Sequence, residues 1–154
     1  TTIHALACNI HAENRLTIVS ASLQATMTLA SNDNIDIIQL GGMVRHSSVS
    51  VVGQYSMEIL RGCSFTKLFL GVDGIDLDFG ISTTDMREAE LNRSMMNAAQ
   101  KTIVLADSSK FGRRGFAKIS GLEDVDIIIT DAKIPQFVAN KIGEMGIELI
   151  IAGS

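Results

Sequence analysis

The sequence is poor in cysteine and lacks long apolar runs, and each shortage excludes a kind of protein. Its two cysteines, Cys8 and Cys63, form no CxxC pair and have no histidine at metal-ligand spacing. They indicate ordinary thiols in a reducing compartment, so we expect a cytoplasmic protein. No apolar run reaches the roughly 20 residues that a membrane helix needs, so a membrane span is not expected.

Positive charge is also in deficit, because 13 lysines and arginines face 17 acidic residues and give a formal net charge of -4. A surface of this sign repels a phosphate backbone, so we do not expect these residues to bind nucleic acid by themselves. The GxSxG, HExxH, Walker A and GxGxxG motifs are absent, which argues against the common hydrolase, zinc-protease, NTPase and dinucleotide-binding classes. His4 and His11 lack a third ligand, so we expect neither a metal site nor a cofactor.

The chain begins with neither a methionine nor a basic segment followed by an apolar stretch and a cleavage site. We therefore expect an excerpt of a longer protein that carries no secretory signal in this part. Its 154 residues, 46% hydrophobic and 19% charged, are typical of one globular domain.

Six short β-rich apolar runs predict strands, and they cover residues 16–19, 35–40, 67–72, 102–106, 125–130 and 147–151. The runs are continuous rather than alternating, as expected where helices cover both faces of a parallel sheet. Helical stretches lie between them. The clearest spans residues 85–100, with Asp85 and Glu88 in a capping-box pattern and Leu91, Met95 and Ala98 on a buried stripe. Pro135 fits the first turn of another helix, which would end near Gly143 or Gly146.

Strands alternating with helices predict a doubly wound α/β domain, with a mostly parallel sheet and helices on both faces. Sheets of this kind bind ligands at the carboxyl ends of their strands, so the polar residues that directly follow the runs are the candidates for a site. They are Ser20 and Ser22, Gly41–Gly42, Asp73–Gly74, Asp107–Lys110 and Asp131.

Each candidate has two interpretations that the spacing leaves open. The segment Asp107–Gly112 is either an anion cradle, in which hydroxyls, backbone N–H groups and Lys110 hold phosphate oxygens, or a capped turn with a solvated lysine. Asp73 and Gly74 either bind sugar hydroxyls or form a tight turn with positive φ, followed by an Asx turn at Asp76. Glu88 is either a carboxylate favoured by the helix dipole or a group that points into the crevice.

The basic residues have two interpretations as well. Arg45 follows a diglycine and either reaches an anionic ligand or stays in water. A basic cluster, interleaved with two phenylalanines, is either a solvated loop or a local site for phosphate or a partner; it comprises Lys110, Arg113, Arg114 and Lys118. The adjacent Met95 and Met96 are either core residues or a subunit contact.

Four segments in the same order resemble the DeoR family of bacterial transcriptional regulators: LGVDGID at 70–76, GISTTDMREAELNRSMM at 80–96, VLADSSKFG at 104–112 and DIIITD at 126–131. Two further segments, IVSASL at 18–23 and LGGMVR at 40–45, look like the strand ends "VTNSL" and "GG.LR" of that family. The resemblance therefore covers essentially the whole chain, residues 1–154. It implies a C-terminal effector-binding domain related in fold to ribose-5-phosphate isomerase and glucosamine-6-phosphate deaminase, which senses phosphorylated sugars or related metabolites. It also implies that a first strand and a winged helix-turn-helix, which contacts operator DNA, lie outside this sequence.

By this resemblance, Thr1 and Thr2 end a "DxGTT" loop that helps to hold the phosphate of the effector. Ser20 and Ser22 flank Ala21, where the family has an asparagine, and Asn92 replaces the lysine of an "EA..KR" pattern that keeps Glu88 and Arg93. The related isomerases use the positions that Asp73, Glu88 and Lys110 resemble for acid-base work and substrate binding, so a sugar-phosphate isomerase or deaminase is the alternative function.

We expect a sensor rather than an enzyme, in a homodimer or homotetramer that binds a sugar phosphate, and operator DNA only through the other domain. Lys110, Ser109 and Thr2 are expected to bind the phosphate, whereas Asp73 and Glu88 bind hydroxyls. The other expected effector-binding residues are Thr1, Ser20, Ser22, Gly42, Arg45, Gly74, Arg93 and Asp107.

Overall fold

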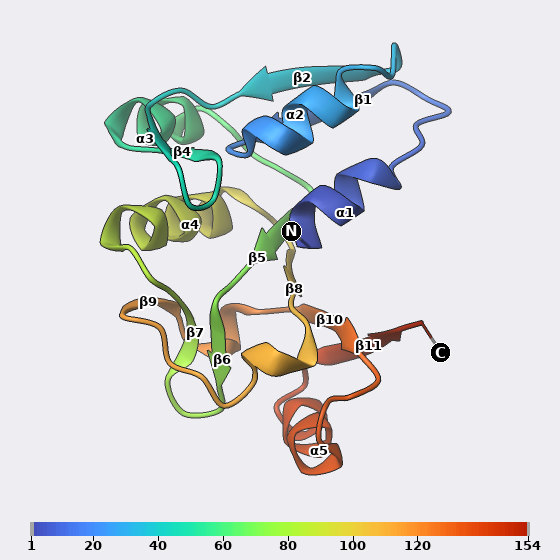
Figure 1. Cartoon of the computed structure of the whole chain (residues 1–154), viewed down its shortest axis with the longest axis vertical. Helices are drawn as coiled ribbons and strands as arrows, with labels where there is room; N and C mark the ends of the chain where they lie inside the picture. Colours follow the sequence, from blue (N-terminus) through green and yellow to red (C-terminus); the bar gives the residue numbers. More distant parts are fainter. Residues whose placement is uncertain (1, 154) are drawn as a thin grey trace. The chain divides into compact units, whose positions relative to one another are not determined.

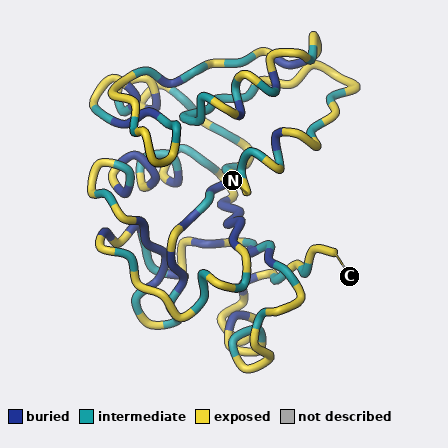
Figure 2. Tube along the Cα trace, viewed as in Figure 1, coloured by how far each residue is buried: buried dark blue, intermediate teal, exposed yellow. Residues whose placement is uncertain are grey.

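The computed structural model describes residues 2–153 and divides the chain into two compact units, residues 1–62 and 63–154. Figure 1 shows the course of the chain, and Figure 2 shows that both units contain buried residues. Each unit has a cluster of buried apolar side chains of its own. None of the helices among residues 2–153 is both long and apolar enough to cross a membrane. Those residues also contain no group of three or more side chains that could hold a metal ion.

The first unit packs helices against a two-stranded parallel sheet. Strand β1 (Leu16–Ser20) pairs with β2 (Ile35–Gln39), with Leu16 opposite Ile35. An antiparallel hairpin follows, made of β3 (Met43–Arg45) and β4 (Ser50–Val52). The helices of this unit are α1 (Thr2–Cys8), α2 (Leu23–Leu29) and α3 (Gln54–Arg61). The core of this unit is small, with Ala7, Ala25, Leu29 and Ile35 at its centre.

The second unit contains a four-stranded parallel sheet in the order β11-β10-β8-β5. Its strands are β5 (Leu68–Gly71), β8 (Thr102–Leu105), β10 (Ile127–Asp131) and β11 (Glu148–Ala152). Helices α4 (Met86–Ala98) and α5 (Gln136–Glu144) and two 3-10 turns, η1 (Ser108–Lys110) and η2 (Leu122–Asp124), belong to the connections. The predicted α/β class with a parallel sheet is thereby confirmed.

A smaller antiparallel sheet in the same unit consists of β6 (Gly74–Asp76), β7 (Gly80–Thr83) and β9 (Ala117–Ser120). All four residues of its central strand β7 are buried. The tight-turn interpretation of Gly74 is wrong, because Gly74–Asp76 is a strand in the structure. Residues 46–49 are the turn between β3 and β4.

All six predicted strands are present, with bounds shifted by no more than two residues. Strand β8 is buried throughout, as a continuous apolar run predicts, whereas the edge strand β11 alternates between exposed and half-buried residues. In α4, Leu91 is buried as predicted, whereas Met95 and Ala98 of the predicted stripe are half-buried. Met96 is part of the buried core, and Met95 packs against that core. Pro135 is the N-cap of α5 rather than its first helical residue.

Candidate functional site

Three carboxylates lie at the carboxyl edge of the four-stranded sheet. In the register of the sheet, Leu105 of β8 is opposite both Gly71 of β5 and Ile129 of β10, so these strands end together. Two carboxylates, Asp73 and Asp107, follow the first two strands, and Asp131 ends the third. Parallel sheets bind ligands at this edge.

The η1 turn between β8 and β9 is held by two of these carboxylates. The Asp107 side chain accepts hydrogen bonds from the hydroxyl of Ser109 and, at 2.9 Å, from its backbone N–H. Asp131 accepts from the backbone N–H of Ser108 at 2.8 Å and from that of Lys133 at 2.8 Å. The turn is therefore capped by Asp107, and two of its N–H groups are already bound to carboxylates.

Hydrogen bonding keeps both carboxylates ionised. The Ser109 side-chain hydrogen bond, supported by its backbone N–H and the nearby charge of Lys110, lowers the pKa of Asp107. The backbone N–H groups of Ser108 and Lys133 lower the pKa of Asp131. Two negative charges thus accompany the ammonium groups of Lys110, beside Asp107, and Lys133, beside Asp131, and the site offers acceptors for hydroxyl groups beside positive charge.

Asp73 lies two residues beyond β5 and is exposed. It accepts a hydrogen bond of 2.9 Å from the hydroxyl of Thr83, a buried residue at the end of β7 that was not among the predicted site residues. The carboxylate is thereby oriented at the sheet edge while remaining accessible. The adjacent threonines 83 and 84 after an apolar strand were the only signal for this partner in the sequence.

Gly74 allows a close approach of two backbone segments. A Cβ atom at this position would lie 2.5 Å from the carbonyl oxygen of Arg113. The positive φ that the tight-turn interpretation requires is absent, because Gly74 is a residue of strand β6. Glycine is needed at position 74 because a side chain there would collide with the backbone of Arg113.

The predicted basic cluster is divided in the structure. Arg114 forms an ion pair of 3.0 Å with Asp76, and its side-chain hydrogen bond is the main cause of the lowered pKa of that carboxyl, followed by the backbone N–H of Phe79. Arg114 and Lys118 also lie over the Phe79 ring, at 5.5 and 5.4 Å from its centroid. Asp76 accepts from the N–H groups of residues 78 and 79, which is the predicted Asx turn.

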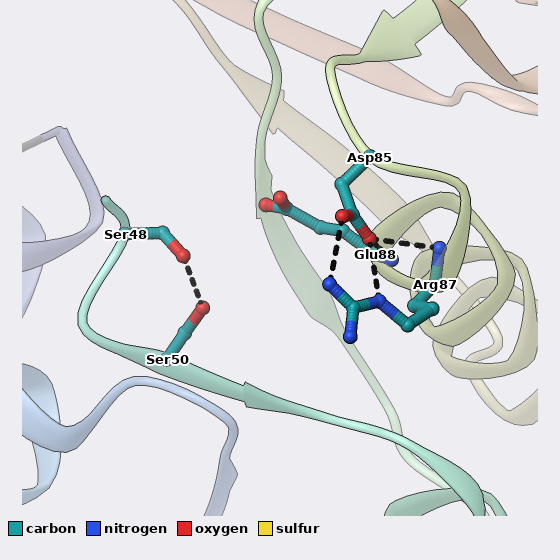
Figure 3. A network of polar contacts seen from close by, with 5 residues as sticks. All are labelled: Ser48, Ser50, Asp85, Arg87 and Glu88. Carbon is teal, nitrogen blue, oxygen red and sulfur yellow. Dashed lines mark hydrogen bonds and ion pairs between the residues drawn. The ribbon is translucent and has the colours of Figure 1, made fainter. Parts of the chain in front are cut away.

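Glu88 lies in the first turn of α4, whose N-cap is Asp85 (Figure 3). Asp85 accepts from the N–H groups of Arg87 at 2.9 Å and Glu88 at 3.2 Å, and it forms an ion pair of 3.1 Å with Arg87. This confirms the cap. Glu88 is half-buried near the positive end of the helix dipole, where a carboxylate is favoured.

Arg93 is not placed with the residues of the carboxyl edge. Its guanidinium donates to the carbonyl of Lys118 at 2.6 Å. It lines a shallow hollow of about 340 Å³ together with Thr102 and Asp126, which stand at the amino ends of β8 and β10. The structure therefore separates Arg93 from Lys110 by the length of the sheet.

In the first unit, Ser20 and Ser22 serve the local backbone. The Ser20 hydroxyl accepts from the Ser22 N–H at 3.0 Å, and the Ser22 hydroxyl, as N-cap of α2, accepts from Ala25 N–H at 3.2 Å. Thr2 is an exposed residue of α1, and Thr1 lies outside the described residues. The two serines are thus placed at the carboxyl end of β1, as predicted, and their hydroxyls bind backbone groups of the same segment.

The β3–β4 hairpin carries the other predicted residues of this unit. Gly42 has a φ of +140°, and a Cβ atom there would collide with the carbonyl oxygen of Val52. Arg45 is in strand β3, opposite Ser50, rather than in a loop. The Ser50 and Ser48 hydroxyls are 2.7 Å apart (Figure 3). This pair was not predicted, although serines are dense between residues 47 and 50.

Comparison with known proteins agrees with the resemblance seen in the sequence. The "DeoR C terminal sensor domain" family matches residues 1–132. A "Putative aga operon transcriptional repressor" of Escherichia coli O157:H7 is 36% identical over 91% of this chain and 49% of its own length. A "Glycerol-3-phosphate regulon repressor" of Haemophilus influenzae is 26% identical over 98% of this chain and 58% of its own length.

A third relative, the "Uncharacterized HTH-type transcriptional regulator YulB" of Bacillus subtilis, is 35% identical over 76% of this chain and 45% of its own length. The chain thus spans about half the length of the curated relatives it matches. These relatives are named as transcriptional regulators and not as enzymes, as the sequence predicts. With residues 1–132 matched by the family, the chain belongs to the DeoR C-terminal sensor domains.

Proposed function

We propose that residues 1–154 are the effector-binding domain of a DNA-binding transcriptional regulator of carbohydrate metabolism, acting as a repressor. The effector is a phosphorylated sugar or a related metabolite. Family membership supports a sensor, and the names of two relatives, which refer to the aga operon and to the glycerol-3-phosphate regulon, support this class of effector. The fold alone would not support this function, because one fold serves many functions.

The observation that carries the proposal is the convergence of acceptors and a cation at one sheet edge. Asp73 and Asp107 follow neighbouring strands, and Lys110 ends the turn that Asp107 caps. Carboxylates accept hydrogen bonds from hydroxyl groups, and an ammonium attracts a phosphate. In this proposal Lys110 and Ser109 bind the phosphate, whereas Asp73, with Gly74 beside it, and Glu88 bind hydroxyls.

The first unit contributes residues of its own. On the family pattern, six of them are proposed to bind the effector: Thr1, Thr2, Ser20, Ser22, Gly42 and Arg45. The Ser22 hydroxyl supports this role because it accepts from one N–H group and can bind a further partner, whereas the Ser20 hydroxyl also donates to the Ser22 carbonyl at 3.1 Å and keeps acceptor capacity alone. Arg93 is proposed less directly, since it would act from the hollow at the amino ends of β8 and β10.

Regulation requires two further features. Operator DNA is bound through a domain outside this sequence, and the regulator works in the cytoplasm, where that DNA lies.

We propose a homodimer or homotetramer, supported in residues 63–154 by exposed apolar side chains such as Met86, Phe116 and Phe137. Light scattering of the full-length protein tests this assembly, and a monomer mass at high concentration contradicts it.

The experiment that tests the function is proton NMR of a sugar-phosphate panel with the full-length protein. The panel contains ribose 5-phosphate, glucosamine 6-phosphate and glycerol 3-phosphate, each beside its unphosphorylated counterpart. Line broadening confined to phosphorylated members, without new product signals, is the expected result. Conversion of an aldose phosphate to a ketose phosphate would instead establish an isomerase.

A further inference from the structure

Arg113 is an exposed residue in the loop that leads from η1 to β9. We propose that its guanidinium is a second phosphate-binding group of the effector site, acting with Lys110. This inference rests on the proposed function and names the side chain that supplies the charge which the η1 turn lacks.

The need for a second cation follows from the charges of the turn. Asp107 and Asp131 both hold the turn and both have a lowered pKa, so they are negative at neutral pH. Lys110, and Lys133, whose charge also lowers the pKa of Asp131, only offset these two negative charges. The backbone N–H of Lys110 is also used, because it donates to the carbonyl of Asp107 at 3.1 Å. A phosphate that carries up to two negative charges therefore favours a further cation beside the turn.

The loop that carries Arg113 is fixed against the antiparallel sheet. Gly112 N–H donates to the carbonyl of Ile75 at 2.8 Å, and Phe111 bridges Ile75. Gly115 N–H donates to the hydroxyl of Ser82 at 2.7 Å, and Ser82 is completely buried. Because both ends of the loop are tied down, the backbone of Arg113 is held in place.

This position lies beside the predicted hydroxyl-binding residue. The carbonyl of Arg113 lies 2.5 Å from where a Cβ of Gly74 would be, and Gly74 follows Asp73 directly. Lys110 is only three residues away along the fixed loop. The backbones of Arg113 and Gly74 are therefore in contact, and the chain places Asp73 one residue and Lys110 three residues from that contact.

The neighbouring cations are already engaged, and Arg113 is not. Arg114 is paired with Asp76, and Lys118 lies over Phe79. Among residues 2–153, no hydrogen bond or ion pair joins the Arg113 side chain to another residue. A guanidinium offers a planar pair of donors that matches two phosphate oxygens, so an unengaged arginine next to a sugar-binding carboxylate fits a phosphorylated ligand.

The test compares Arg113→Gln with Arg114→Gln in the full-length protein. Both variants remove one positive charge from adjacent positions, so any general electrostatic effect is shared. Titration calorimetry uses the sugar phosphate that broadens in the NMR panel, its unphosphorylated counterpart and inorganic phosphate. We expect Arg113→Gln to weaken binding of the sugar phosphate and of inorganic phosphate about tenfold or more, and Arg114→Gln to change it less than about threefold. Arg113→Lys should restore part of the loss.

Each outcome assigns the failure to one claim. Equal losses in both glutamine variants, or none in Arg113→Gln, would refute the role of Arg113 while leaving the sensor intact. Binding of the unphosphorylated sugar that falls as much as that of the sugar phosphate would show a structural effect and also refute it. If no member of the panel binds the wild-type protein, the proposed function itself fails. Thermal unfolding of both variants confirms that they are folded.

Discussion

The Asp131 carboxylate at the end of β10 accepts a hydrogen bond of 2.8 Å from the backbone N–H of Ser108, the first residue of η1. This bond joins the end of one strand to the turn that follows its neighbour. The sheet edge therefore depends on a carboxylate that must stay ionised, and the same is true of Asp107 on the other side of the turn.

Stability should fall at acid pH through these two groups. Their pKa values are lowered on folding from 3.8, so their contribution is fully present above about pH 4 and is lost as the pH falls through the lower folded values. Urea unfolding between pH 7 and pH 2.5 measures this loss. Asp131→Asn should make the same curve flatter below pH 4, and a curve as steep as that of the wild type would contradict the assignment.

Lys110→Met should weaken binding of the phosphorylated effector by roughly 1.5 to 3 kcal/mol, the usual contribution of a hydrogen bond to a charged group. Lys101→Met is the matched control, because Lys101 is exposed and directly precedes β8, at the opposite end of the strand that leads to η1. Calorimetry with the sugar phosphate from the NMR panel distinguishes the two. Unchanged affinity of Lys110→Met removes this lysine from the site.

Gly74→Ala should destabilise the second unit by about 1 to 3 kcal/mol, because its methyl group would press on the backbone of Arg113. Gly143→Ala is the opposite control. It lies in α5, nothing lies within 4 Å of its Cβ position, and alanine there should stabilise by about 0.5 to 1 kcal/mol. Urea denaturation gives both values, and a Gly74→Ala variant as stable as the wild type would contradict the close contact.

The strands were predictable because burial determines their sequence. Strand β8 is buried on both faces, and its sequence is an unbroken apolar run. The N-cap residue Asp85 indicates the start of α4. The antiparallel strands β6, β7 and β9 were not recognised as strands. Each has only three or four residues, and glycines at positions 74 and 80 indicate turns unless the partner segment is known.

The site was predictable as a set of strand ends and unpredictable in its hydrogen bonds. The sequence placed Asp107 and Asp131 after apolar runs, yet whether they bind a ligand or cap a turn depends on Ser108 and Ser109. Likewise, four cations between residues 110 and 118 look alike in sequence. Only the positions of Asp76 and Phe79 separate Arg114 and Lys118 from Arg113.

Ile128→Ala should show how strongly the parallel sheet supports this edge. Ile128 is completely buried in β10, three residues before Asp131, and belongs to the core of the second unit. Truncating a buried isoleucine removes apolar contacts and leaves a cavity, so we expect a loss of about 2 to 5 kcal/mol. Ile150→Ala, in the neighbouring strand β11, should cost much less, because Ile150 is 39% exposed. Similar urea midpoints for the two variants would contradict this packing. A large loss of stability confined to Ile128→Ala would show that the buried core around β10 stabilises the sheet edge at Asp131.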